Sequence, residues 1–356
     1  MVVGVGKTGR RRKGYTVSCE MAGAGPGRRV ASALMNRRDF LLKSGAAVSL
    51  GLLARSSLSA QVTPTSPVPA PATPMPVQPP TLVTEFRPLR GDVGYFTGRG
   101  GSIGWLSSAA ALVAVDTQFP DTAAIFLRDL PGRNGRTLDA VINTHHHGDH
   151  TGGNGVFKPA TKTIVAQANV PDLMLAAAKR NPTPNAPAPT LPDATFATEW
   201  RHEFGREKIS ARYFGPAHTS GDIVVHFEQA NVVHTGDLVF NRLYPVVDRP
   251  AGARFKGWIT RLEEIVKLYP ADAVYVFGHG KAKFGVTGGH ADILVFRDYL
   301  TVLLAHVEKE IKAGKPREEI VKLENFPGFP DLHAPPGPGN RLGGNLGTAY
   351  DELTSG

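Results

Sequence analysis

The chain has 356 residues, of which 41% are hydrophobic, so it can bury a substantial core in one large domain or two average ones. Its formal charge of +9 would suit a nucleic-acid partner, but residues 1–60 hold 11 Lys/Arg and 2 Asp/Glu, which leaves 29 residues of each sign elsewhere. A remainder without net charge has no basic footprint for a phosphate backbone, so we expect no nucleic-acid partner. The single cysteine, Cys19, excludes an intramolecular disulfide and a cysteine-rich zinc site.

The first sixty residues are similar to an export signal. Arg37 and Arg38 begin a sequence that resembles the twin-arginine consensus, and a moderately apolar stretch, 44–54, follows them. That stretch is too short to span a membrane. We interpret 1–60 as an N-terminal extension plus a twin-arginine signal peptide, with the true start at Met35. The alternative is a buried amphipathic helix with a chance arginine pair.

This interpretation predicts that the precursor uses the twin-arginine export machinery and that the mature protein is periplasmic or secreted by a bacterium, without a stable membrane anchor. Residues 61–81 are expected to be a linker, because 61–80 contain eight prolines and cannot build a core. The catalytic domain is expected at 82–323. Residues 324–356, rich in Pro and Gly, are expected to form an irregular C-terminal tail.

The folded part alternates β-rich segments with helices. Short apolar runs between glycine-rich turns predict strands, and apolar residues at helical spacing predict helices. In chain order we expect strands at 93–97, 102–106 and 111–116, a helix at 121–129, strands at 138–143 and 163–166, a helix at 170–179, strands at 209–213, 223–227 and 231–234, a helix at 255–268, a strand at 273–277 and a helix at 291–312. This mixed order favours a layered α/β sandwich.

The residues that carry chemistry follow the strand at 138–143. The sequence there is His145-His146-His147-Gly148-Asp149-His150. In extended backbone, His145 and His147 project to one side and can reach one metal ion, while Asp149 and His150 can reach a second. His146 is then expected to face away from its neighbours and to be structural. The alternative is an exposed histidine-rich loop without a metal.

The order of the motifs resembles that of the metallo-β-lactamase superfamily. The histidine cluster and the following Thr-Gly-Gly-Asn are similar to the family's signature, and three later motifs occur in the expected order. These are Ala-His-Thr-Ser-Gly-Asp at 217–222, His-Thr-Gly-Asp at 234–237 and Gly-His-Gly at 278–280. The resemblance spans roughly residues 85–300. It implies the family's fold, a four-layer αββα sandwich.

The resemblance also implies a dinuclear metal site. Carried over residue by residue, the first ion binds His145, His147 and His218, the second binds Asp149, His150 and His279, and Asp237 bridges the two. Nitrogen and carboxylate ligands without a thiolate suit zinc, two ions per chain, and leave iron and manganese open. Asp116, at the end of a strand, resembles a carboxylate that accepts a hydrogen bond from a ligand imidazole.

The activity implied by this site is hydrolysis of a small-molecule substrate. Two neighbouring ions can supply hydroxide at neutral pH and polarise a carbonyl group. Asp149 is the expected catalytic residue, because its carboxylate can accept the proton as the reaction proceeds. No serine or cysteine nucleophile is needed.

Asp237 bears on the choice of substrate. The antibiotic-destroying members of the family carry Cys or Ser at this place, and a bridging Asp resembles lactonases, thioesterases, phosphodiesterases and some exported lactamase-like proteins. We rank a lactam, lactone or ester first, a glyoxalase II-like thioester second and a phosphodiester third. Lys281, Lys283 and Arg297 are the candidate basic pocket for glutathione in the second reading. The alternative from another class is a non-catalytic metal-binding protein of the same fold.

Overall fold

The structure is a computed structural model and describes residues 82–355 apart from 183, 185–186 and 335–339. The predictions for the signal peptide, the start at Met35, the arginine pair and the linker lie outside these residues. Within the described part, no helix is both long and apolar enough to cross a membrane.

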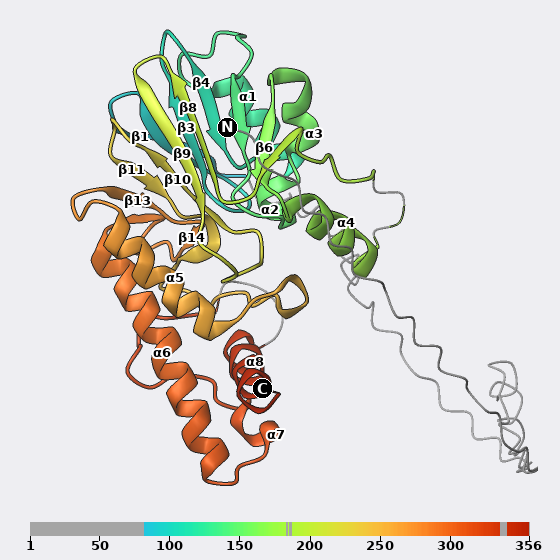
Figure 1. Cartoon of the computed structure of the whole chain (residues 1–356), viewed down its shortest axis with the longest axis vertical. Coiled ribbons are helices and arrows are strands. Elements are labelled where there is room, and N and C mark those ends of the chain that lie inside the picture. Colours follow the sequence, from blue (N-terminus) through green and yellow to red (C-terminus); the bar gives the residue numbers. More distant parts are fainter. Residues whose placement is uncertain (1–81, 183, 185–186, 335–339, 356) are drawn as a thin grey trace, which may run out of the picture. The chain divides into compact units, whose positions relative to one another are not determined.

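The first half of the described chain forms a seven-stranded sheet (Figure 1). Strands β1 to β4 form an antiparallel meander, and β4 to β7 run parallel. The strands, in both sequence and spatial order, are β1 Glu85–Arg90, β2 Val93–Thr97, β3 Ile103–Ser107, β4 Leu112–Val115, β5 Ala140–Ile142, β6 Ile164–Gln167 and β7 Ala194–Phe196.

The second half forms a six-stranded sheet that faces the first. Its spatial order is β15 Thr287–Gly288, β13 Val274–Val276, β11 Val232–His234, β10 Ile223–Phe227, β9 Glu207–Tyr213 and β8 Glu199–Phe204. Strands β11 and β13 run parallel, and the remaining pairs are antiparallel. A small two-stranded sheet joins β12, Phe240–Asn241, to β14, His279–Gly280.

The alternation of side chains along the strands accounts for the layers. In β4, Val113 and Val115 pack between the sheets, whereas Leu112 and Ala114 pack on the outer side. Both faces of such strands are buried, which is why the strands are continuously apolar. Burial of these faces against a second sheet and against helices supplies the main favourable free energy of folding.

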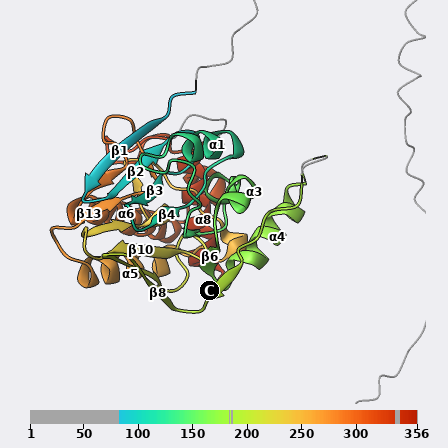
Figure 2. The same ribbon diagram turned by 90° about the horizontal axis from the view of Figure 1, so that it is seen from above.

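Helices cover both outer faces. Helix α1, Pro120–Asp129, and the short α3, Asn154–Phe157, pack on the first sheet. Helices α5, Phe255–Leu268, and α6, His290–Lys312, pack on the second sheet through residues such as Trp258 (Figure 1). The expected αββα sandwich is therefore confirmed. Helix α4, Val170–Arg180, projects from the body of the sandwich (Figure 2).

Apart from a last helix near the C-terminus, the remaining elements of the described residues are short. They are α2 Gly148–Thr151, α7 Arg317–Ile320 and three single-turn 3₁₀ helices at Lys158–Ala160, Gly236–Leu238 and Arg249–Ala251.

The prediction of an irregular C-terminus from Glu324 is wrong for its last part. Residues Arg341–Thr354 form helix α8, which packs against α6. Leu342, Leu346 and Ala349 recur at helical spacing and are buried in the core formed with α5 and α6. The Asn340 side chain accepts a hydrogen bond from the Gly343 amide and caps the helix. The glycine content of the segment concealed this apolar face.

Six strands were also missing from the expectation, namely β1, β7 and β8 and the two-residue strands β12, β14 and β15. β1, β7 and β8 each expose half or more of their residues, so they lack the apolar run by which the other strands were predicted. β1 and β8 are edge strands whose places in the sheets are fixed by backbone pairing with β2 and β9.

Candidate metal centre

Parallel strands bring the predicted site residues to one edge of the sandwich. β4 and β5 are parallel neighbours, as are β11 and β13, and the carboxyl ends of parallel strands lie together. Asp116 follows β4, and His145 lies in the segment after β5. Asp237 follows β11, and His279 follows β13. His218 comes from the loop between β9 and β10, so the residues converge from both sheets.

Four of these side chains form a first group. Ligand atoms of His145, His147, His218 and Asp237 lie within 4.8 Å of one another. His147 Nδ1 is 3.1 Å from His145 Nε2 and 3.0 Å from His218 Nε2. Three nitrogens around a tetrahedral zinc ion would be about 3.3 Å apart, given zinc–nitrogen bonds of about 2.0–2.1 Å. The spacing of the nitrogens therefore fits a shared ion.

Asp149, His150 and His279 form a second group. His279 Nε2 lies 3.1 Å from Asp149 Oδ2 and 3.3 Å from His150 Nε2. Asp149 and His150 belong to α2, which begins directly after His147. The single turn of helix brings both side chains to the site from adjacent positions.

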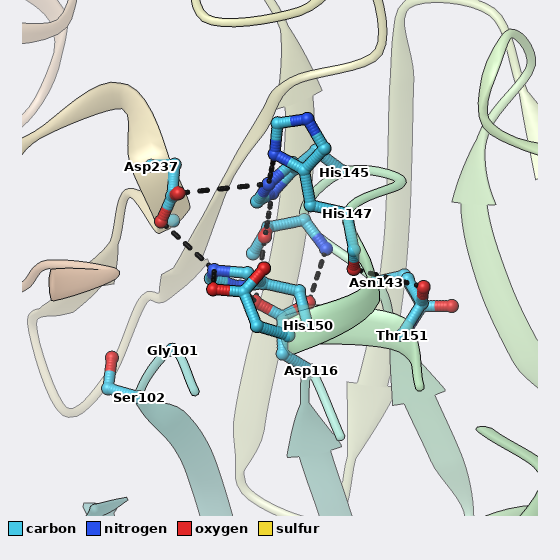
Figure 3. A network of polar contacts seen from close by, with 12 residues as sticks. Gly101, Ser102, Asp116, Asn143, His145, His147, His150, Thr151 and Asp237 are labelled. Carbon is cyan, nitrogen blue, oxygen red and sulfur yellow. Dashed lines mark hydrogen bonds and ion pairs between the residues drawn. The ribbon is translucent and has the colours of Figure 1, made fainter. Parts of the chain in front are cut away.

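Asp237 contacts both groups, and Figure 3 shows its carboxylate directed at His145 of the first group and at His150 of the second. Its Oδ2 is 3.5 Å from His218 Nε2 and 3.9 Å from His145 Nε2, whereas its Oδ1 is 3.0 Å from His150 Nε2 and 3.4 Å from His279 Nε2. The side chain is 3% exposed, and Oδ1 has no hydrogen-bond partner among the described residues. A buried carboxylate oxygen requires compensation, and a cation between the imidazoles would provide it.

Asp116 holds the segment that carries the histidines. Its carboxylate accepts hydrogen bonds from the Thr144 amide and the Thr144 hydroxyl, each at 2.7 Å, and lies 2.7 Å from His150 Nδ1. The expected hydrogen bond between Asp116 and a proposed ligand imidazole is therefore confirmed. It leaves His150 Nε2 directed at Asp237, and this contact fixes the ring's orientation.

The expectation that His146 faces away from both neighbours is wrong for His147. The chain bends at 144–146 instead of staying extended, and the rings of His146 and His147 lie 4.4 Å apart. His146 is buried, and its Nε2 lies 3.5 Å from Asp248 Oδ2. The alternation of side chains assumed in the prediction holds only for extended backbone.

The loop after β12 contributes contacts that no sequence pattern indicated. Asp248 Oδ2 lies 3.0 Å from His147 Nε2, and the Val246 carbonyl lies 3.0 Å from His218 Nδ1. Each acceptor engages the ring nitrogen that does not face the other proposed ligands, so it selects the tautomer whose other nitrogen is free to bind an ion. Arg180, at the end of α4, lies 3.6 Å from Asp248 Oδ2. The loop after β12 contacts histidines that lie far from it in sequence. The only sign of this contact in the sequence is an acidic residue, Asp248, in a loop.

Comparison with known proteins shows the family. A sequence profile described as the Metallo-beta-lactamase superfamily matches residues 97–279, half of the chain and the span that includes all seven predicted ligands. The chain belongs to the metallo-β-lactamase superfamily. Within this superfamily it is 32% identical over 188 residues to a hydroxyacylglutathione hydrolase of Methylococcus capsulatus, covering 50% of this chain and 62% of that protein. It is 28% identical over 196 residues to a metallo-beta-lactamase type 2 of Bacillus cereus, covering 53% and 72%.

Solved structures of the superfamily's fold agree. A metallo-beta-lactamase from Pontibacter korlensis aligns with a TM-score of 0.51 at 20% identity and covers 62% of this chain and 99% of that one. A double mutant of the sec-alkyl sulfatase PisA1 aligns with a TM-score of 0.57 at 16% identity and covers 76% of this chain and 50% of that one. At these identities the likeness concerns the fold alone.

The electrostatics of this metallo-β-lactamase-family site divide its histidines. Burial lowers the pKa of His145 well below its usual range and that of His218 to about 3, so both imidazoles stay neutral and can donate lone pairs. Burial also opposes protonation of His279, but Asp237 and Asp149 outweigh it and raise the pKa to about 9. Of these three residues, His279 is the one at which positive charge is favoured, because it lies beside both Asp149 and Asp237, and either a proton or a cation can supply that charge.

The predicted basic pocket does not gather at the site. Lys283 is exposed and lies 3.6 Å from Asp331, and Arg297 on α6 pairs with Glu263 and Asp298. Lys281 lies two residues after His279, so it is adjacent to the site in sequence. Two of the three residues thus have carboxylate partners elsewhere, which gives the glutathione reading no support from these side chains.

Proposed function

We propose that this chain is a metal-dependent hydrolase with a dinuclear centre, and that zinc is its metal. The observation that carries the proposal is the position of Asp237, whose two oxygens face two different groups of ligands at 3.0–3.9 Å. His145, His147 and His218 would hold one ion and Asp149, His150 and His279 the other, with Asp237 shared. The complete set of donors argues against a non-catalytic protein with a decayed site.

The side chains divide the work of the reaction. Ions bound there would supply hydroxide at neutral pH and polarise the substrate carbonyl. Asp149 is 30% exposed, more than Asp237, so it is the carboxylate that solvent and substrate can reach. We assign Asp149 the acceptance and return of the proton. Asp116, Asp248 and Val246 act through the histidines, whose tautomers and orientations they fix.

We propose a lactone, ester or lactam as the substrate class. An additional negative charge at Asp237 reduces the Lewis acidity available to the carbonyl, so a more electrophilic lactone or ester should react better than a common β-lactam. The test is kcat/KM for both substrate types with one zinc-loaded preparation. Efficient turnover of β-lactams without turnover of lactones or esters would contradict this assignment.

A glyoxalase II-like thioesterase is the second candidate, and the relative named hydroxyacylglutathione hydrolase favours it. The purified protein should be assayed on panels of lactams, lactones, thioesters and phosphodiesters, with metal analysis in parallel. His147→Ala is the control, because it removes one proposed ligand and should abolish turnover. Equal turnover by His147→Ala would assign the activity to a contaminant or to another site.

We further propose that the protein is exported to the bacterial periplasm through the twin-arginine pathway. The motivating residues are Arg37 and Arg38, followed by the apolar stretch 44–54. Replacing both arginines with lysine should trap the precursor in the cytoplasm, and the exported protein should begin near Gln61. Exported material that retains residues 1–34 would contradict both the start site and the signal.

A further inference from the structure

A cavity of about 630 Å³ lies beside the loops that carry the proposed metal ligands. It is lined by Gly215 and Pro216, which precede His218, and by Arg249, which follows Asp248. Its other walls are the N-terminal half of α5 and the end of α8, two elements shown with their neighbours in Figure 1. The cavity is thus adjacent in sequence to the site but contains none of the seven proposed ligands.

Four cationic side chains line this cavity. They are Arg249, Arg254, Lys256 and Arg261. Such a concentration of like charge is costly unless anions offset it. Among the described residues, Glu352 is the one carboxylate of the lining and lies 3.9 Å from Arg249, whereas Glu264 lies outside the lining, 3.1 Å from Arg261. The described lining residues therefore include four cations and one carboxylate.

The carboxylate of Glu352 is already engaged. Its oxygens accept hydrogen bonds from the Phe255 amide at 2.8 Å and the Lys256 amide at 3.1 Å, so Glu352 satisfies the first amides of α5. The side chain is 7% exposed, which leaves it little freedom to turn towards the arginines. The N-terminus of α5 is therefore occupied, and the attraction of the cavity for anions comes from the side chains.

Two guanidinium nitrogens lack an acceptor. Arg249 Nη1 and Arg261 Nε are buried and have no hydrogen-bond partner among the described residues. Arg261 is held in place through Nη1, which donates to the Phe214 carbonyl. Guanidinium groups bind carboxylates and phosphates through paired N–H donors, and fixing one end of the side chain reduces the entropy lost on binding.

We propose that this cavity is a binding site for an anionic oxygen-bearing group, such as a phosphate, a sulfate or a carboxylate. The anionic group belongs either to the distal end of an anionic substrate or to a free anion. The residues of this cavity are connected to the loops of the proposed metal centre. Arg249 adjoins Asp248, which contacts His147, and the Arg254 amide donates to the Ala217 carbonyl next to His218. An anion bound in the cavity would therefore contact residues that adjoin the proposed centre.

Calorimetric titration of the metal-loaded full chain with inorganic phosphate tests the site. Lys256→Gln and, separately, Arg249→Gln should each weaken phosphate binding about threefold or more, and higher salt should weaken binding by the wild type. Arg206→Gln, an exposed arginine in the turn between β8 and β9, is the matched control and should bind as the wild type does. Metal content is measured in every variant, because phosphate also binds metal ions.

Equal phosphate affinity in Lys256→Gln, Arg249→Gln and the wild type, at equal metal content, would overturn the site. Lys256 serves as the first test because its hydrogen bonds in the described structure are made by its backbone and its side chain is exposed, so its replacement should not disturb folding.

A second measurement identifies the source of the anion, and it rests on the proposed hydrolase function. KM is compared for 4-nitrophenyl acetate and for the anionic mono-4-nitrophenyl succinate. If Lys256→Gln raises KM for the succinate ester alone, the anion bound in the cavity is part of the substrate. Unchanged KM values with weakened phosphate binding support a free anion. Absence of turnover on both esters would count against the proposed substrate class and would leave the phosphate result intact.

Discussion

At the scale of single residues, Asp237 and His218 should affect different ions. Asp237 Oδ1 lies closer to His150 and His279 than Oδ2 lies to the first group, so Asp237→Ser should mainly weaken the second metal. His218→Ala should deplete the first. The expected loss is about tenfold or more in affinity for the ion concerned. Metal content after dialysis against a graded chelator measures both.

The control for these two variants is His202→Ala, an exposed histidine on β8 outside both groups. It should retain the metal content of the wild type. Equal loss of both ions in Asp237→Ser and His218→Ala would show that the two groups do not act as separate sites.

Asp222 should make the free energy of unfolding depend on pH. Burial raises its pKa from 3.8 to about 7, although the Thr219 amide and hydroxyl, each 2.7 Å away, oppose the shift. Between about pH 4 and pH 7 the folded chain therefore holds a proton at Asp222 that the unfolded chain has lost. The contribution of this residue to stability is largest at the acid end and declines as pH rises through that window, by up to about 1.4 kcal/mol per pH unit.

Asp222→Asn removes this titration. The unfolding free energy of the variant, relative to the wild type, should therefore rise from pH 5 to pH 7. Urea unfolding of metal-free protein measures the difference, and Asp92→Asn, on an exposed turn, is the control. A difference that is constant with pH would contradict the raised pKa.

At the scale of elements, α8 offers a pair of adjacent glycines with opposite predictions. A Cβ at Gly343 would lie 2.5 Å from the Val321 carbonyl oxygen, whereas a Cβ at Gly344 would meet nothing within 4 Å. Gly344→Ala should stabilise the protein by about 0.5–1 kcal/mol, because alanine favours the helix. Gly343→Ala should destabilise it by about 1–3 kcal/mol through overpacking against backbone.

Thermal and urea unfolding of the two α8 variants test this contrast. If both substitutions stabilised the chain equally, α8 would not be packed against the segment at 321 as the structure has it. A helix frayed from the core would give that result, since each substitution would then report helix propensity alone.

At the scale of the whole molecule, metal removal should affect both stability and activity. We expect close to two ions per chain, and loss of activity with chelators. Each ion that binds only the folded state should add about 4 kcal/mol of stability at a thousandfold excess over its dissociation constant. The loss of bound metal, and of activity with it, should become steeper below about pH 6, where free imidazoles bind protons in place of metal.

Elemental analysis, activity and thermal unfolding with and without chelator measure these effects on one preparation. A purified protein without bound metal, or one that is fully active after chelation, would contradict the prediction. Metal binding should depend on folding because the proposed ligands come from both sheets, and no single segment of the described chain supplies a complete site.

The sequence alone determined the local patterns. The apolar strands and the amphipathic helix at 255–268 were predicted within a few residues, since burial imposes a period of two or of 3.6 residues on neighbouring positions. The seven candidate ligands lie in short motifs with fixed spacing, so they could be named before the structure. Their role as ligands stays a prediction, although the structure brings them into two adjacent groups.

Only the tertiary structure decided the contacts between distant segments. Asp248 contacts His147 across 101 residues of chain, and Glu352, near the end of the described residues, contacts the start of α5 across 97 residues. Edge strands and the glycine-rich α8 also escaped prediction, because their places depend on partners rather than on their own composition. Such contacts leave no periodic signal in the sequence, because each one requires only a single residue. The position of that residue depends on how the intervening strands and helices pack.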